Sequence, residues 1–215
     1  MRRNQVLIGA IVGVAVFYAI AIIALGSPPD AAASGADVVK WFREHDDSVR
    51  VAVWCTTFAM VFMGVYAAYV RKALPKPHAD IFFAGAITLI AETIVQTWIL
   101  AGLALHPRNL QPSTARLALD VANYWGPVLI SATILMLAPI VVLAFRGEAG
   151  LPRWLGWLAG IALAEQIIES ITIFGTRGFT EPGGAMNLVL GAGLTTIALL
   201  AIGVVIATER EPVRA

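Results

Sequence analysis

The chain has 215 residues, of which 59% are hydrophobic and 13% charged, and its formal net charge is +1. A soluble domain of this size has too little interior for so much apolar surface, and a nucleic-acid-binding protein needs a larger basic excess. The composition therefore excludes a soluble enzyme, a disordered tail and a nucleic-acid binder. It predicts a polytopic membrane protein.

Six stretches of the chain are long and apolar enough to cross a bilayer. An α-helix rises about 1.5 Å per residue and needs roughly 20 residues to cross a hydrocarbon core of about 30 Å. Runs that are apolar on every face argue against a barrel of alternating strands. We predict an all-α fold, one transmembrane domain over 1–215 built as a six-helix bundle, with spans near 6–25, 49–70, 81–105, 121–145, 154–174 and 185–207.

The first apolar run has a second interpretation. Arg2 and Arg3, an apolar stretch and the small residues at 31–34 also fit a secretory signal that is later removed. The apolar core of a signal usually has roughly 7 to 15 residues, and this stretch has about 20. The length favours a retained span.

The basic residues indicate an orientation. Nine Lys and Arg fall on the side of the termini and six on the other side, whereas acidic residues divide four to seven. Because cytoplasmic loops are rich in Lys and Arg, we expect both termini in the cytoplasm. The bias of the basic residues toward Arg and the abundance of Ala and Gly are typical of high-GC bacterial genes, so we expect a multi-pass protein of the bacterial cytoplasmic (inner) membrane. The nine are Arg2, Arg3, Arg71, Lys72, Lys76, Arg146, Arg153, Arg210 and Arg214, and the six are Lys40, Arg43, Arg50, Arg108, Arg116 and Arg177.

Two outer loops have the pattern of amphipathic helices. Residues 35–47 place Val38 and Phe42 on one side and charged residues on the other, after Ser34 as a candidate cap. Residues 113–120 are a second candidate that leads into the fourth span. We expect the first of these helices to lie flat at the outer membrane surface.

Two prolines interrupt the fourth predicted span. Pro127 and Pro139 each remove a backbone donor and favour a kink in that helix. A kinked helix either opens a cavity or fits the shape of its neighbours.

Three acidic residues lie deep inside the apolar runs, and they are the strongest candidates for chemistry. An ionised side chain at this depth costs several kcal/mol unless it is paired, hydrated or protonated, so these residues must face protein or water. Residues four apart share a helical face. Two polar stripes result, namely Glu92 with Gln96 and Thr88 in the third span, and Glu165 and Glu169 with Thr172 in the fifth. Counted from the inner ends, the stripes have the same depth, and we predict that they face each other across an outward-opening cavity.

Candidate site residues follow from these stripes. The candidate catalytic residues are Glu92, Glu165 and Glu169, and the candidate ligand-binding residues are Gln96, Thr88, Gln166, Thr172, Asn123 and Arg177. Arg177 is the nearest basic candidate to partner Glu169. The remaining span polars, Ser131, Thr133, Asn187, Thr195 and Thr196, are interpreted as interhelical hydrogen bonds.

Three roles remain open for the buried acids. They fit a membrane-embedded enzyme, an acid/base isomerase or cyclase acting on a lipid or isoprenoid. They also fit a proton- or cation-coupled transporter, or a structural or accessory subunit whose helices are held by hydrogen bonds. In each case the membrane lipid is the surrounding partner. The first two predict a cavity for a small lipophilic or cationic ligand.

No cofactor, metal or nucleic acid is expected. The spans contain no pair of histidines and no lysine, and the chain has no nucleotide-binding loop or hydrolase motif. Whether copies of the chain associate as a homo-oligomer is left open.

Two short motifs carry a resemblance to a known group of proteins. They are Val39-Lys40-Trp41-Phe42 before the second span and Leu151-Pro152-Arg153-Trp154-Leu155-Gly156 entering the fifth. In these the chain resembles six-helix integral membrane proteins from actinobacteria and related bacteria, which are assigned to domain-of-unknown-function families. The resemblance implies six helices and no particular activity.

Overall fold

The computed structural model describes residues 3–208, without the side chains of residues 3 and 4. Over that range the chain is helical with no strand, and six of its helical segments are long and apolar enough to span a membrane. The prediction of an all-α fold with six candidate spans is confirmed. The α-helices are α1 (Arg3–Leu25), α2 (Gly35–Ala73), α3 (His78–Leu105), α4 (Pro112–Asn123), α5 (Trp125–Arg146), α6 (Arg153–Glu169) and α7 (Ala192–Thr208).

Short segments of other helix types complete the chain. Two of them bear on the site: a 3₁₀ turn, η2 (Ser170–Phe174), continues α6, and a π-helix, η4 (Met186–Gly191), leads directly into α7. The charges at Arg2, Glu209, Arg210, Glu211 and Arg214, which enter the predicted orientation, lie outside the described residues.

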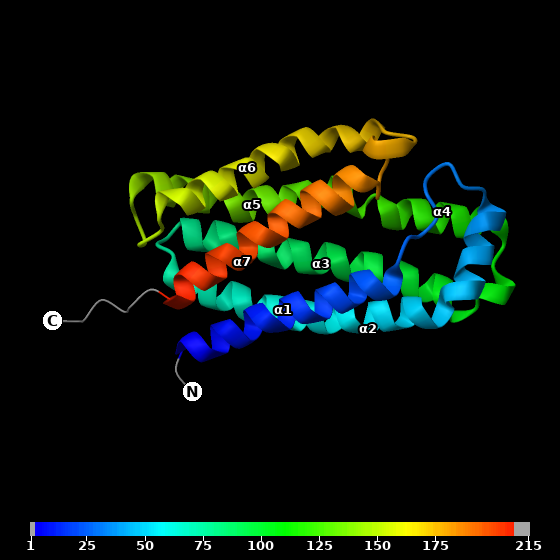
Figure 1. Cartoon of the computed structure of the whole chain (residues 1–215), viewed down its shortest axis with the longest axis horizontal. Coiled ribbons are helices and arrows are strands. Elements are labelled where there is room, and N and C mark those ends of the chain that lie inside the picture. Colours follow the sequence, from blue (N-terminus) through cyan, green and yellow to red (C-terminus); the bar gives the residue numbers. More distant parts are fainter. Residues whose placement is uncertain (1–2, 209–215) are drawn as a thin grey trace.

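The six spans form a closed ring in chain order. Each span packs against the next, α1 on α2, α2 on α3, α3 on α5, α5 on α6 and α6 on α7, and α7 returns to α1. Figure 1 shows the start of α1 and the end of α7 at the same end of the bundle, opposite α4. This follows from an even number of spans joined by short connections.

The end of the bundle that carries α4 extends beyond the spans. Residues 35–47 are the first part of the continuous helix α2, not a separate helix, and Figure 1 shows this part turning across the end of the bundle. Ser34 caps it by accepting a hydrogen bond from the Asp37 backbone at 3.2 Å. A second apolar core, which includes Val38, Phe42 and Leu119, joins this segment to the end of α3 and to α4. We call these three segments the α4 cap.

The break between α4 and α5 falls near the first of the two prolines. The fourth span was predicted to begin at residue 121, but α4 ends at Asn123 and α5 begins at Trp125, after a break at Tyr124. Pro127 has no N–H to donate to the carbonyl four residues earlier, at Asn123, so the helical ladder is interrupted there. Pro139, by contrast, lies inside α5, which continues to Arg146.

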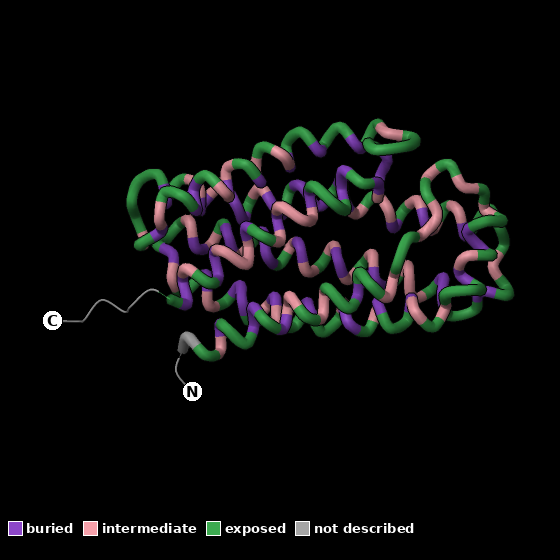
Figure 2. Tube along the Cα trace, viewed as in Figure 1, coloured by how far each residue is buried: buried purple, intermediate pink, exposed green. Residues whose placement is uncertain are grey.

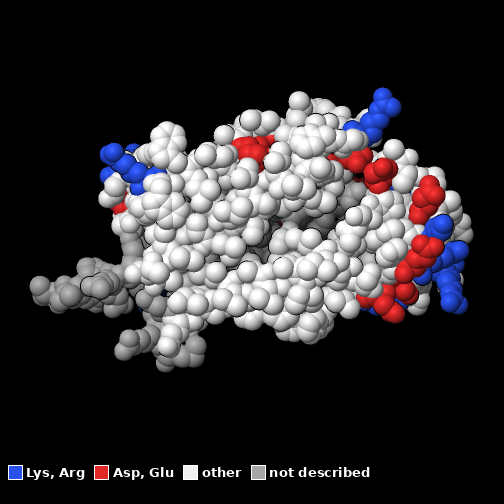
Figure 3. Space-filling model, in the orientation of Figure 1, with Lys and Arg blue, Asp and Glu red and all other residues white. Residues whose placement is uncertain are grey.

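The surface of the spans suits a hydrocarbon environment. Charged residues gather toward the two ends, and a mainly uncharged belt lies between them (Figure 3). Within this belt large apolar side chains are exposed, Trp98 at 68% and Trp157 at 65%. Along each span buried and exposed residues alternate (Figure 2), as expected when one face meets protein and the other meets lipid.

Candidate functional site

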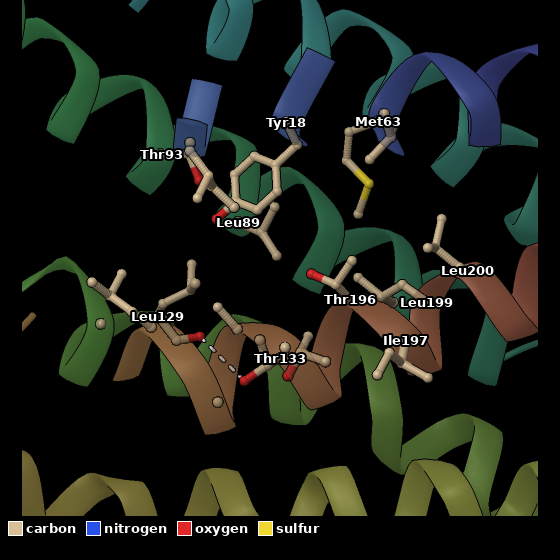
Figure 4. A pocket seen from close by; sticks show the side chains of 18 of the residues that line it. Tyr18, Met63, Leu89, Thr93, Leu129, Thr133, Thr196, Ile197, Leu199 and Leu200 are labelled. Carbon is tan, nitrogen blue, oxygen red and sulfur yellow. Dashed lines mark hydrogen bonds between the residues drawn. The ribbon is translucent and has the colours of Figure 1, made fainter. Parts of the chain in front are cut away.

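An apolar cavity of about 420 Å³ lies inside the ring of helices. All six spans contribute side chains to its wall, including Tyr18 of α1, Met63 of α2, Leu89 of α3, Leu129 of α5 and Leu199 of α7. In Figure 4, Tyr18, Leu89 and Met63 lie on one side of this space, and Leu129, Thr196 and Leu199 lie on the other. Its size and its mostly apolar wall are those of a site for a small molecule.

A buried carboxylate with amide partners forms one part of the wall. Glu169, at the end of α6, is 2% exposed. Its Oε2 accepts a hydrogen bond from Gln166 Nε2 at 2.6 Å, and its Oε1 accepts one from Asn187 Nδ2. Thr133 of α5 donates to Gln166 Oε1 at 2.5 Å, and Asn187 Nδ2 also lies 3.2 Å from Thr172 Oγ1. The network thus joins α5, α6, η2 and η4.

Two glycines let the backbone approach this network closely. A Cβ built on Gly191 would lie 1.8 Å from Glu169 Oε2, and one built on Gly126 would lie 2.8 Å from Asn187 Cγ. Asn187 and Gly191 both belong to the π-helix η4, a type of turn that is frequent at functional sites. Any side chain at Gly191 would therefore displace the carboxylate.

The cavity wall also holds a buried hydroxyl that makes no hydrogen bond. Thr195 of α7 is 6% exposed, and its Oγ1 has no partner in the described part of the protein. A buried polar group without a partner costs about 1 to 3 kcal/mol. Thr195 therefore keeps an unsatisfied hydroxyl in the wall of the cavity. Another hydroxyl of the wall, Thr93 Oγ1, accepts a hydrogen bond from Trp125 Nε1 at 3.3 Å.

No basic side chain balances the carboxylate. Among the residues that line the cavity in the described range, Glu169 is the one Asp, Glu, Lys, Arg or His. Arg177, the predicted partner, is exposed, and no ion pair joins it to Glu169 in residues 3–208. The net charge of the site therefore depends on Glu169 and on the molecule that occupies the cavity.

The other two buried acids lie outside this cavity. Glu92 and Glu165 are half-buried and do not line it, because α5 packs between α3 and α6 and separates the two predicted stripes. This corrects the expectation that the stripes face each other. Each carboxyl keeps one buried oxygen without a hydrogen bond, Glu92 Oε2 and Glu165 Oε1. The second oxygen of Glu165 accepts from Gln166 Nε2 at 3.1 Å.

The remaining predicted residues are dispersed. Gln96 Nε2 donates to the Ala122 carbonyl of α4 at 3.3 Å, and Thr88 Oγ1 donates to the Ala84 carbonyl of its own helix at 3.0 Å. Asn123 packs against Gly183, where a Cβ would lie 2.9 Å from Asn123 Cγ. Gln96 and Asn123 thus join neighbouring segments, Thr88 bonds within its own helix, and none of the three lines the cavity. Gln166 and Thr172 belong to the network around Glu169.

Three residues of the site were not among the predicted catalytic or ligand-binding residues. Thr133 and Asn187 do form interhelical hydrogen bonds, as expected, but those bonds lead to Glu169 through the wall of the cavity. Thr195 lines the cavity without making a bond. Asn187, Gly191 and Thr195 are four residues apart and therefore form one helical face of small and polar residues. This spacing is the pattern in the sequence that could have indicated their place in the site.

No protein-family model, curated protein or solved structure matches this chain. The resemblance to six-helix membrane proteins of bacteria therefore stays a prediction.

Proposed function

We propose that the chain is a multi-pass protein of a bacterial inner membrane that binds a small membrane-soluble amphiphile in its central cavity. The polar end of the ligand, a protonated amine or a hydroxyl, meets Glu169, and its apolar body fills the space between the spans. The observation that carries the proposal is a 2%-exposed carboxylate in the wall of an apolar cavity that holds no basic residue in the described range.

The chemistry of Glu169 supports a ligand that donates hydrogen bonds. A carboxylate has about four acceptor positions, and each oxygen of Glu169 accepts one amide hydrogen bond in this structure. Positions remain for further donors. An ammonium group would donate to Glu169 and also remove the cost of an unpaired charge in an apolar site.

A binding role is better supported than acid/base catalysis. General acid and general base must both lie within reach of one substrate. Of the three candidate acids, Glu169 lines the cavity, whereas Glu92 and Glu165 do not. Of these three carboxylates, Glu169 alone could therefore exchange a proton with a ligand in the cavity.

The proposal is tested by binding of a long-chain bromoalkylamine, followed through quenching of Trp125 fluorescence in the cavity wall. The other five of the six tryptophans are replaced by Phe to leave this signal alone. We expect saturable quenching that Glu169→Gln weakens at least about tenfold, since a hydrogen bond to a charged group contributes about 1.5 to 3 kcal/mol.

Two controls make the test specific. Glu165→Gln removes a neighbouring carboxylate that does not line the cavity. It should leave the affinity for the amine within about twofold of the parent, because this side chain makes no hydrogen bond to a ligand in the cavity. The neutral bromoalkane of the same length should bind more weakly than the amine. Equal affinity of the parent and Glu169→Gln for the amine would refute the proposal.

A further inference from the structure

Some residues of the cavity wall are also exposed on the outside of the molecule. Ile22 of α1 is 55% exposed, and across from it Leu188 of η4 is 52% and Ile197 of α7 is 55% exposed. Ala19 of α1 is exposed and lines the cavity too. Exposed wall residues on facing segments of α1 and of η4 with α7 indicate that the cavity reaches the surface between them. Figure 3 shows the surface hollowed in this region, between α1 and α7. We call the gap bounded by these four residues the side opening.

α1 and α7 are in contact on the side of the opening that lies away from α4. A Cβ built on Gly203 of α7 would lie 2.7 Å from Ile11 Cδ1 of α1 and 2.7 Å from Tyr66 Cε2 of α2. Tyr66 also donates a hydrogen bond to the Leu199 carbonyl at 2.7 Å. The helices thus touch in the half of the bundle away from α4 and part in the half near it.

The chemistry of the rim indicates what passes through it. Its four residues are aliphatic, and the surface beside the hollow between α1 and α7 is uncharged (Figure 3). A rim that faced water would be expected to carry polar side chains, because exposed apolar edges are costly there. We infer that the cavity opens sideways into the hydrocarbon layer between α1 and α7, and that its ligand is an amphiphile whose alkyl chain comes from the bilayer.

The position of the polar groups fits this route. Leu188 on the rim follows Asn187, the hydrogen-bond partner of Glu169, and Thr195 lies one turn beyond Gly191 on the same helical face. A polar group carried in from the membrane would therefore reach the part of the wall that holds Glu169 and Asn187. The inference rests on the proposed function for the identity of the polar end, but the opening itself can be tested without any ligand.

Gly193 provides a substitution that narrows the side opening. It lines the cavity, it is partly exposed, and a Cβ at this position meets nothing within 4 Å. Leucine should therefore fit without a clash and fill part of the gap. Gly160 of α6 is the matched control, because it also has no neighbour within 4 Å of a built Cβ but does not line the cavity.

The experiment uses the full chain with Trp125 as its single tryptophan, in vesicles of phosphatidylcholine brominated midway along one acyl chain. Bromine quenches tryptophan on contact, so quenching reports access of lipid chains to the cavity. We expect brominated lipid to quench Trp125 and aqueous acrylamide to quench it weakly. Gly193→Leu should lower the lipid quenching at least about twofold, and Gly160→Leu should leave it unchanged.

Three outcomes would overturn the inference. They are equal lipid quenching in Gly193→Leu and Gly160→Leu, acrylamide quenching stronger than that by lipid, and absence of lipid quenching in the parent. A second variant, Ala19→Phe on the facing rim, should also lower the quenching by lipid. It provides the test if Gly193→Leu does not fold. Lipid quenching without saturable amine binding would leave the side opening intact and reject the proposed polar end, so the two proposals fail separately.

Discussion

At the scale of single residues, Glu169 shows why depth in a span is not enough to define a site. Glu92, Glu165 and Glu169 all lie inside apolar runs, and the sequence alone treats them as equal candidates. Burial distinguishes them, because Glu169 is 2% exposed beside the cavity and the other two are half-buried elsewhere. The difference comes from Asn187 and Gly191, which place an amide donor and close backbone against Glu169.

Gly191→Ala should destabilise the protein by about 1 to 3 kcal/mol, the usual cost of forcing an extra methyl group into a packed site. The reason is the 1.8 Å approach of its Cβ to Glu169 Oε2. Thermal unfolding in detergent measures the change. Gly193→Ala, two residues further on, has open space and should be neutral or stabilising by up to about 1 kcal/mol.

A double variant identifies the cause of this loss. Adding Glu169→Ala to Gly191→Ala removes the clashing carboxylate, so the two changes should cost less together than the sum of their separate costs. If Gly191→Ala and Gly193→Ala unfold at the same temperature, the packing described around Glu169 is incorrect.

At the scale of helices, the spans were predictable and their arrangement was not. Hydropathy over about 20 residues is a local property, and all six spans follow from it. Which helices face one another depends on contacts far apart in the chain. The place of α5 between α3 and α6 is such a contact, and for this reason the two predicted polar stripes do not face each other. The continuity of α2 was also missed. The change from an amphipathic to an apolar pattern was interpreted as a boundary between a surface helix and a span, although no helix-breaking residue lies there.

The α4 cap offers a prediction at this scale. Arg116 of α4 donates to the Asp30 and Ala33 carbonyls at 2.8 and 3.3 Å and to Asp120 at 2.5 Å, and its side chain is 16% exposed. Arg116→Leu removes these bonds, so hydrogen exchange in residues 26–34 should become faster at least about tenfold, the equivalent of about 1.4 kcal/mol.

The control for this change is the exposed Arg108, in the connection between α3 and α4. Arg108→Leu should leave the exchange rates of residues 26–34 as they are in the parent. Unchanged exchange in Arg116→Leu would show that these bonds do not hold the loop.

At the scale of the whole molecule, α7 packs against α1 and closes the ring, and the start of α1 and the end of α7 lie at the same end of the bundle. The excess of Lys and Arg on that side predicts that it faces the cytoplasm. A phosphatase or fluorescent reporter fused after Ala215 should therefore report a cytoplasmic position, and a fusion in the connection between α1 and α2 should report an external one. The reverse pattern would refute the proposed orientation.

The central claim is that the cavity binds an amphiphile through Glu169, and an experimental structure of the protein in lipid nanodiscs tests it most directly. We predict elongated density between the spans, with its polar end within hydrogen-bond distance of Glu169 and its tail leading to the gap between α1 and α7. A cavity filled with water, or one closed by contact of α1 with α7 along their whole length, would contradict the account.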